Sequence, residues 1–185
     1  MIIFIVGGAK SKKSYFGEYY AERLKNDNGK LYYLATMKPY DKEDLERIAE
    51  HVKVRDGHGF ITIEKQKDIQ EISVKLKNND TILLDSITSL ATNEMFSNKE
   101  INEKISNKIS NDIIEISSKL KNLVIVSDYV FSDGIKYDNY TEVFKRELGR
   151  INCNVAKAAD VVIESSFGNA IVHKGKEKID NERFR

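Results

Sequence analysis

The chain has 185 residues, and its 30 lysine and arginine residues nearly balance 29 aspartate and glutamate residues, for a formal net charge of +1. This length suits one domain, and the balance excludes an overall electrostatic attraction to nucleic acid or to an anionic membrane. The longest apolar run, residues 1–6, is far shorter than the roughly 20 residues that span a bilayer and follows no basic segment, so we expect a cytoplasmic protein without a membrane span.

Buried strands and amphipathic helices alternate along the sequence. The first strand, at 2–6, is apolar throughout, as expected inside a parallel sheet, and Phe16, Tyr19 and Leu24 then recur at helical spacing. The same patterns predict further strands at 30–36, 59–66, 81–87 and 122–128, and helices at 14–26, 41–55, 69–76, 98–121 and 139–159. Apolar runs on both sides of residues 167–169 predict a closing hairpin.

These elements predict an α/β fold in three layers, with a mainly parallel sheet and an antiparallel hairpin at its edge. We expect a single domain over residues 1–175, followed by a solvated C-terminal tail at 176–185. The sequence does not decide what the helix at 98–121 packs against. Isoleucines recur along 98–121 in an almost unbroken stripe, which suits packing on the sheet and contact with another subunit equally well.

The segment GGAKSKKS, residues 7–14, connects the first strand to the first helix. A phosphate-binding loop needs a tight turn with inward backbone N–H groups, a lysine for the outer phosphates and a hydroxyl for magnesium, and Lys13 and Ser14 stand at the last two positions. The pattern G-x-x-x-x-G-K-[ST] also requires a glycine where this chain has Lys12. A positive φ there would cost a lysine about 1–3 kcal/mol. The loop is therefore either a phosphate site or a plain turn with solvated lysines.

Asp85 ends a hydrophobic strand, TILLDSI, in the middle of the chain. Its carboxylate could hold magnesium opposite Ser14, although an aspartate at a strand end is also a common helix cap. In a parallel sheet both residues would lie at the carboxyl edge, where ligands of such folds bind. Together they favour a nucleotide-binding site.

Further motifs follow in a fixed order. The block around the second strand and the next helix contains Thr36, Asp41, Glu43, Arg47, Ile48 and His51. Arg55 precedes the third strand, and Thr62 and Glu64 lie within it. Asp85, Thr88 and Asn93 lie at and after the end of the fourth strand, FKRELGRIN (144–152) lies in the last long helix, and AAD (158–160) lies at its end. With GGAKSKKS, these blocks resemble the bifunctional adenosylcobinamide kinase / adenosylcobinamide-phosphate guanylyltransferase family of cobalamin biosynthesis, whose loop reads G-G-A-R-S-G-K-S. The resemblance covers residues 1–175.

The resemblance implies a three-layer P-loop (RecA-like) fold, a homotrimer, and Mg²⁺, GTP or ATP, and a cobinamide as ligands. In this family the histidine corresponding to His51 attacks the α-phosphate of GTP and passes GMP to adenosylcobinamide phosphate, which the same enzymes make from adenosylcobinamide. A substantially unprotonated imidazole suits that attack near neutral pH. His51 and Lys13 are thus the expected catalytic residues, with Ser14 and Asp85 as metal ligands. The implied nucleotide-binding residues are Gly7, Gly8, Ala9, Lys10, Ser11, Lys12, Lys13, Ser14, Thr36, Met37, Lys38, Val52, Lys53, Val54, Arg55, Glu64 and Asp85.

The chain departs from the family pattern near the expected site. Besides Lys12, the family's N-E-V-G-x-G after the fifth strand reads DYVFSDG here, so Tyr129 replaces a glutamate and Phe131 a glycine. Cys153 replaces a glutamine; as the single cysteine it excludes an internal disulfide, and we expect it to be a small packed side chain.

These departures leave three interpretations open. The first is the family enzyme, with its kinase half altered or lost. The second is a non-enzymatic relative that binds nucleotide or a corrinoid as a partner subunit. The third is a P-loop kinase of another small molecule, in which Ser14 and Asp85 act and His51 is a half-exposed histidine on a charged helix.

Overall fold

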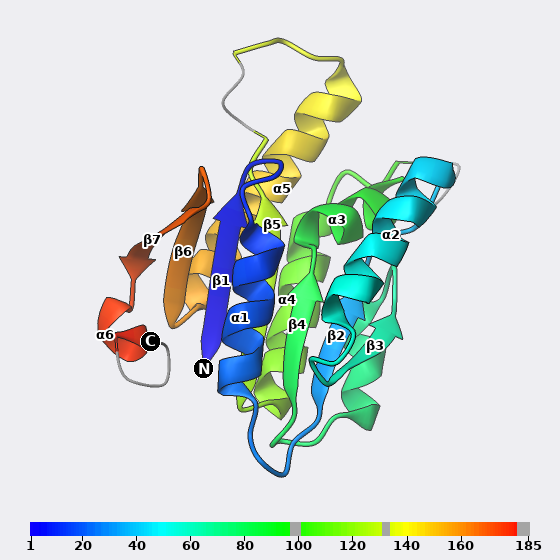
Figure 1. Cartoon of the computed structure of the whole chain (residues 1–185). Coiled ribbons are helices and arrows are strands. Elements are labelled where there is room, and N and C mark those ends of the chain that lie inside the picture. Colours follow the sequence, from blue (N-terminus) through cyan, green and yellow to red (C-terminus); the bar gives the residue numbers. More distant parts are fainter. Residues whose placement is uncertain (97–100, 131–133, 181–185) are drawn as a thin grey trace.

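A seven-stranded sheet in the order β3-β2-β4-β5-β1-β6-β7 forms the centre of the computed structural model, which describes residues 1–96, 101–130 and 134–180, without the side chains of Arg47 and Val54 (Figure 1). The strands are β1 (Ile2–Gly7), β2 (Leu31–Ala35), β3 (Phe60–Glu64), β4 (Thr81–Asp85), β5 (Asn122–Asp128), β6 (Val161–Ser166) and β7 (Asn169–Lys174). All neighbouring strands are parallel except β6 and β7, which form an antiparallel pair. The predicted parallel sheet with an edge hairpin is therefore confirmed.

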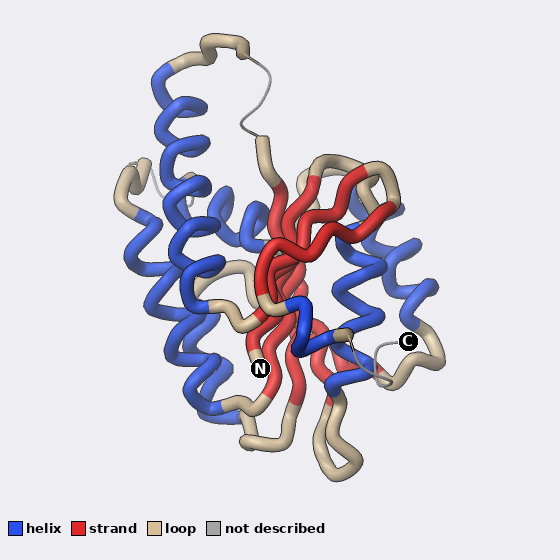
Figure 2. The backbone as a smooth tube through the Cα atoms, turned by 90° about the vertical axis from the view of Figure 1, so that its left-hand side faces the viewer, coloured by secondary structure: helices blue, strands red, loops and turns tan. Residues whose placement is uncertain are grey.

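Helices cover both faces of the sheet (Figure 2). The helical elements are α1 (Lys13–Leu24), α2 (Lys42–Arg55), the 3₁₀ helix η1 (Ile69–Lys75), α3 (Ile87–Met95), α4 (Ile105–Lys119), α5 (Asn139–Ala158) and α6 (Lys176–Ile179). Alternate residues of each inner strand point to opposite faces, so that Ile3 and Ile5 join the core under α1, and Phe4 joins the core under α3, α4 and α5. Each inner strand is therefore buried on both sides, which explains its unbroken apolar sequence.

The isoleucine stripe of α4 packs inside this chain. Ile105, Ile109, Ile113 and Ile116 are all buried in the core formed with the sheet and α5. The stripe therefore does not provide a subunit contact. Cys153, in contrast, is exposed rather than packed, which corrects the expectation, because α5 turns its Leu148, Ile151 and Val155 face toward the core.

Several element boundaries differ from the predicted ones. The strand expected at 81–87 ends at Asp85, because Ser86 caps α3, a helix that the sequence patterns did not indicate. The Ser86 hydroxyl accepts a hydrogen bond from the Ser89 N–H at 3.3 Å. The helix expected from residue 98 begins at Ile105, while residues 97–100 lie outside the described part.

The C-terminal segment is only partly solvated. Within its described residues it forms α6, where Ile179 is buried in the core beside Ile3 and Val161, and Lys178 pairs with Asp160 at 2.7 Å. Burial of the Ile179 side chain in the core favours packing of this segment against the domain. The expectation of a solvated tail is therefore wrong for residues 176–180. Residues 181–185 lie outside the described part.

Candidate active site

The carboxyl ends of the parallel strands bring the predicted site residues to one edge of the sheet, the upper edge in Figure 1. Gly7 at the end of β1 pairs with Asp128 of β5 on one side and with Ser165 of β6 on the other. Asp85 ends β4, the strand on the far side of β5, and pairs with Val126. The phosphate loop therefore opens between strand ends that carry carboxylate and hydroxyl groups.

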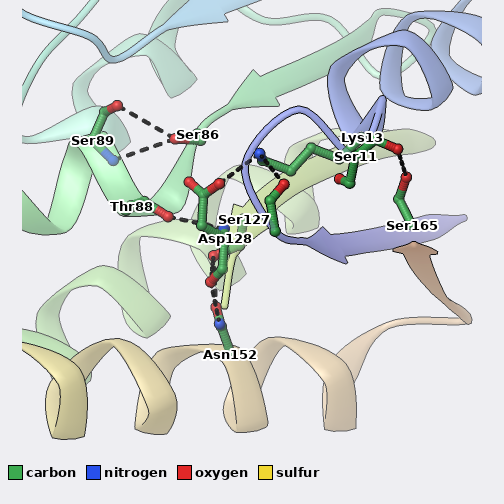
Figure 3. A network of polar contacts seen from close by, with 10 residues as sticks. Ser11, Lys13, Ser86, Thr88, Ser89, Ser127, Asp128, Asn152 and Ser165 are labelled. Carbon is green, nitrogen blue, oxygen red and sulfur yellow. Dashed lines mark hydrogen bonds and ion pairs between the residues drawn. The ribbon is translucent and has the colours of Figure 1, made fainter. Parts of the chain in front are cut away.

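The loop adopts the conformation that its motif requires, although it lacks the motif's second glycine. Lys12, the N-cap residue of α1, has φ 72° and ψ 19°, and Lys10 has φ 55°. Both lysines are thus in the left-handed region, where a side chain costs about 1–3 kcal/mol. The surrounding fold offsets this cost through a hydrogen bond from the Ser165 hydroxyl to the Ser11 carbonyl at 2.6 Å (Figure 3).

Close packing under the loop explains the first glycine. A Cβ on Gly7 would lie 2.5 Å from both the Ser165 carbonyl oxygen and the Ser11 hydroxyl. The Ser11 hydroxyl is itself buried, and no hydrogen-bond partner is found for it among the described residues. The hydroxyl therefore lies beneath the loop, against Gly7 and Ser165, without the hydrogen bond that a buried polar atom normally makes.

Lys13 reaches across the loop from the first residue of α1 (Figure 3). Its ammonium group donates to the Gly8 carbonyl at 3.1 Å and forms an ion pair with Asp128 at 2.5 Å. Asp128 was not predicted as a site residue, although its place at a strand end is the same signal that pointed to Asp85. In this structure a carboxylate therefore neutralises the lysine that the motif assigns to the phosphates.

Ser14 and Asp85, the predicted metal ligands, both line one cavity of about 260 Å³. Asp85 accepts a hydrogen bond from the Tyr33 hydroxyl at 2.9 Å. No cluster of three or more histidine, cysteine, aspartate or glutamate side chains suited to a metal ion is found in the described part of the chain. One hydroxyl and one carboxylate still fit Mg²⁺, which binds through one or two protein oxygens together with phosphate oxygens and water.

The same cavity contains His51 and lies between α2 and the ends of β2, β3 and β4. Its lining consists of Ser14, Tyr33, Ala35, Met37, Pro39, Leu45, Ile48, His51, Val52, Arg55, Thr62, Glu64, Asp85, Ser86 and Ser89. Apolar side chains of α2 thus face polar groups at the strand ends, a composition that suits a flat base with a phosphorylated sugar. His51 is half-buried on the α2 side.

Arg55 anchors the end of α2 beneath this cavity. Its guanidinium stacks on the Tyr33 ring at 3.5 Å and faces the Glu18 carboxylate at 3.8 Å, while its Nη1 is buried without a hydrogen-bond partner in the described part. Burial raises the pKa of Glu18 to about 7, against the opposing effect of Arg55. Burial likewise raises the pKa of Tyr33. Arg55 thus brings a positive charge to the cavity lining, and its buried Nη1 faces Glu18.

Thr36 lies beside the cavity, but its hydroxyl and carbonyl groups already form hydrogen bonds within the chain. Its hydroxyl donates to the Ser86 carbonyl at 2.7 Å and accepts from the Ser86 N–H at 2.8 Å, and the Asn93 amide donates to its carbonyl at 2.8 Å. These hydrogen bonds join the end of β2 to Ser86 after β4, and to Asn93 in α3. This role accounts for both motif residues without a ligand.

The remaining predicted residues divide into two groups. Met37, Val52 and Glu64 line the cavity, whereas Lys38 and Lys53 do not. The side chain of Val54, and Phe131 in the edge segment, lie outside the described residues. Sequence patterns missed Tyr33, Glu18 and Ser165, which are a mid-strand aromatic residue, a helix carboxylate and a strand serine without a distinctive motif.

Comparison with known proteins gives the family. Residues 3–172 match the family model described as "Cobinamide kinase / cobinamide phosphate guanyltransferase". The chain belongs to this family. It is 27% identical over 174 residues to the "Bifunctional adenosylcobalamin biosynthesis protein CobU" of Escherichia coli (strain K12), and 29% identical to the protein of the same name from Salmonella typhimurium. Each match covers 88% of this chain and 93% of the relative.

The structure resembles that of an ATPase domain, which confirms the predicted three-layer P-loop (RecA-like) fold of this family member. The solved ATPase domain superimposes with a TM-score of 0.53 and 12% sequence identity, covering 92% of this chain and 78% of that domain. At this identity the likeness concerns the fold alone.

Proposed function

We propose that the protein is a guanylyltransferase that carries GMP on His51 and transfers it from GTP to adenosylcobinamide phosphate. The observation that carries the proposal is the single cavity shared by His51, Arg55, Ser14 and Asp85. The proposed nucleophile, a buried arginine and two oxygen groups suited to magnesium thus line one cavity, to which the phosphate motif contributes Ser14. Family membership supplies the substrate class.

In the proposed first step, an unprotonated ring nitrogen of His51 attacks the α-phosphorus of GTP. A nitrogen–phosphorus bond forms, the oxygen–phosphorus bond to the β-phosphate breaks, and pyrophosphate leaves. In the second step an oxygen of the substrate phosphate attacks the same phosphorus, and His51 leaves as the neutral ring. Each displacement concentrates negative charge on phosphate oxygens, which we expect Arg55 to neutralise, together with Lys13 once a phosphate takes the place of Asp128 beside it.

Binding groups of the loop and the cavity orient the nucleotide for this chemistry. Backbone N–H groups of the loop suit the phosphates, and the apolar face of α2 suits the base. Mg²⁺, held by Ser14 and Asp85, would supply charge neutralisation at the phosphate oxygens. The proposal includes GTP and ATP as nucleotides, a cytoplasmic location and a homotrimeric assembly, and family resemblance supports these details. No helix in the described residues has the length and apolar character needed to cross a membrane.

Phosphorylation of adenosylcobinamide is the second reaction that we propose. The loop retains the left-handed backbone at Lys12 that the motif normally assigns to glycine, which favours retention of the kinase half. If the kinase half is lost, the protein would accept adenosylcobinamide phosphate but not adenosylcobinamide.

Intact-mass measurement after incubation with GTP and magnesium tests the first reaction. We expect a gain of one GMP per chain that is stable in alkali, labile in acid and absent in His51→Ala. His58→Ala is the matched control, because His58 lies just beyond α2, is exposed and contacts Glu22 at 2.9 Å outside the cavity. Reversible GTP binding without a mass gain would favour a non-enzymatic relative. Transfer of the γ-phosphate to an unrelated acceptor would favour a different kinase.

A further inference from the structure

Lys13 of the phosphate motif forms an ion pair with Asp128, the last residue of β5. Lys13 Nζ lies 2.5 Å from Asp128 Oδ1, and the two side chains are only 12% and 24% exposed. Lys13 is the residue that the motif assigns to the outer phosphates. A phosphate that binds it must therefore displace, or lie beside, a carboxylate that is shielded from water.

Asp128 is held rigidly in this place. Its N–H donates to the Thr88 hydroxyl at 2.9 Å, and its carbonyl accepts from the Asn152 amide at 3.1 Å, as Figure 3 shows. The next residue donates its N–H to the Gly7 carbonyl at 3.3 Å, which ties the end of β5 to the start of the loop. Because these backbone contacts fix the strand end, only a side-chain rotation can move the carboxylate away from Lys13.

The other lysines of the loop do not take over this pairing. The Lys12 side chain extends toward the β6–β7 turn, where its Cε would lie 3.6 Å from a Cβ on Gly168. Lys10 is exposed, and neither it nor Lys12 forms an ion pair in the described part of the chain. The family motif quoted above has a neutral asparagine where this chain has Asp128. The added carboxylate is therefore a property of this chain, and Lys13 is its partner.

We propose that Asp128 makes the phosphate loop selective for the magnesium complex of a nucleoside triphosphate over the free nucleotide. A phosphate group bound to Lys13 would lie next to the Asp128 carboxylate, and the two negative groups would repel each other at low local dielectric. Magnesium held between the phosphates and the Ser14 and Asp85 oxygens would cancel much of that repulsion. This inference rests on the proposed nucleotide-binding function.

Equilibrium binding of a fluorescent GTP analogue tests the proposal. An analogue with a methylene bridge between the α and β phosphorus atoms prevents guanylylation of His51, so that only affinity is measured. The full-length chain and Asp128→Asn are titrated with saturating magnesium and with EDTA. Asn keeps the backbone contacts to Thr88 and Asn152 and removes only the charge. Asp27→Asn is the matched control, because it removes an exposed carboxylate after α1, at the opposite edge of the sheet.

We expect Asp128→Asn to bind the analogue about tenfold more tightly in EDTA, with a smaller gain in magnesium, so that the enhancement by magnesium falls about tenfold. Asp27→Asn should show the same increase in affinity with magnesium as the unmodified chain. An unchanged enhancement in Asp128→Asn, with the chain still labelled by GMP, would overturn this inference alone. Loss of binding in a folded Asp128→Asn, checked with Asp128→Ala and circular dichroism, would instead make Asp128 a direct ligand and also overturn it. If neither the unmodified chain nor either variant binds the GTP analogue, the proposed function is overturned as well.

Discussion

Replacement of Lys12 by glycine is expected to stabilise the protein. Lys12 has φ 72°, a left-handed conformation that costs a residue with a side chain about 1–3 kcal/mol. Glycine adopts this conformation freely but also gives the unfolded chain more freedom, which offsets about 0.4–1 kcal/mol. The free energy of unfolding should therefore rise by about 0.5–2 kcal/mol. For a chain of this size that corresponds to a melting temperature higher by roughly 1–8 °C.

Chemical denaturation monitored by circular dichroism measures this change, with the denaturant dependence of unfolding expected to stay constant. Lys12→Ala removes the same charge but keeps a Cβ, so it should not show the gain. Lys119→Gly, in the regular last turn of α4, should lower stability by about 1 kcal/mol. If Lys12→Gly were no more stable than the unmodified chain, or if Lys12→Ala matched it, backbone strain at this position would not be the operative cost.

Three further perturbations follow from the site. Glu18 has a folded-state pKa of about 7, raised from 4.5, so stability should fall as pH rises between these values, and Glu18→Gln should flatten that dependence in thermal melts. Gly7→Ala places a Cβ 2.5 Å from the Ser165 carbonyl and should destabilise the chain by about 1–3 kcal/mol; an unchanged denaturation midpoint would contradict the close packing. Tyr33→Phe removes the hydrogen bond to Asp85 and should weaken magnesium-dependent GTP binding roughly threefold in a fluorescence titration, whereas unchanged affinity would show that Asp85 needs no such support.

The fold could be predicted largely from the sequence because its signals are local. Inner strands that are buried on both faces must be apolar throughout, and the helices between them must carry one apolar stripe, so the alternation is visible in the residue order. The sequence patterns did not indicate α3 for two reasons. Its N-cap residue, Ser86, directly follows the end of β4, and most residues of the helix are buried, so apolar and polar residues do not alternate at helical spacing. The late start of α4 and the docking of Ile179 depend on neighbours distant in sequence.

Motif spacing made the phosphate loop and Asp85 visible as site candidates, since each stands at the end of a recognisable strand, whereas His51 became a candidate through the family resemblance. Their arrangement around one cavity required the crossover connections of the sheet, which bring strand ends from distant parts of the chain to one edge. The occupied hydroxyl of Thr36 and the stacking of Arg55 on Tyr33 are likewise invisible in the residue order.

Local sequence patterns were sufficient to predict the layer architecture, the family and the chemical types available at the site, because apolar periodicity and motif spacing are properties of neighbouring residues. The left-handed backbone of Lys12 and the pairing of Lys13 with Asp128 become visible in the folded chain alone. The two residues of that pair are separated by most of the chain, and they meet because β5 lies directly beside β1 in the sheet. Contacts between distant segments depend on strand order, which the local patterns do not encode.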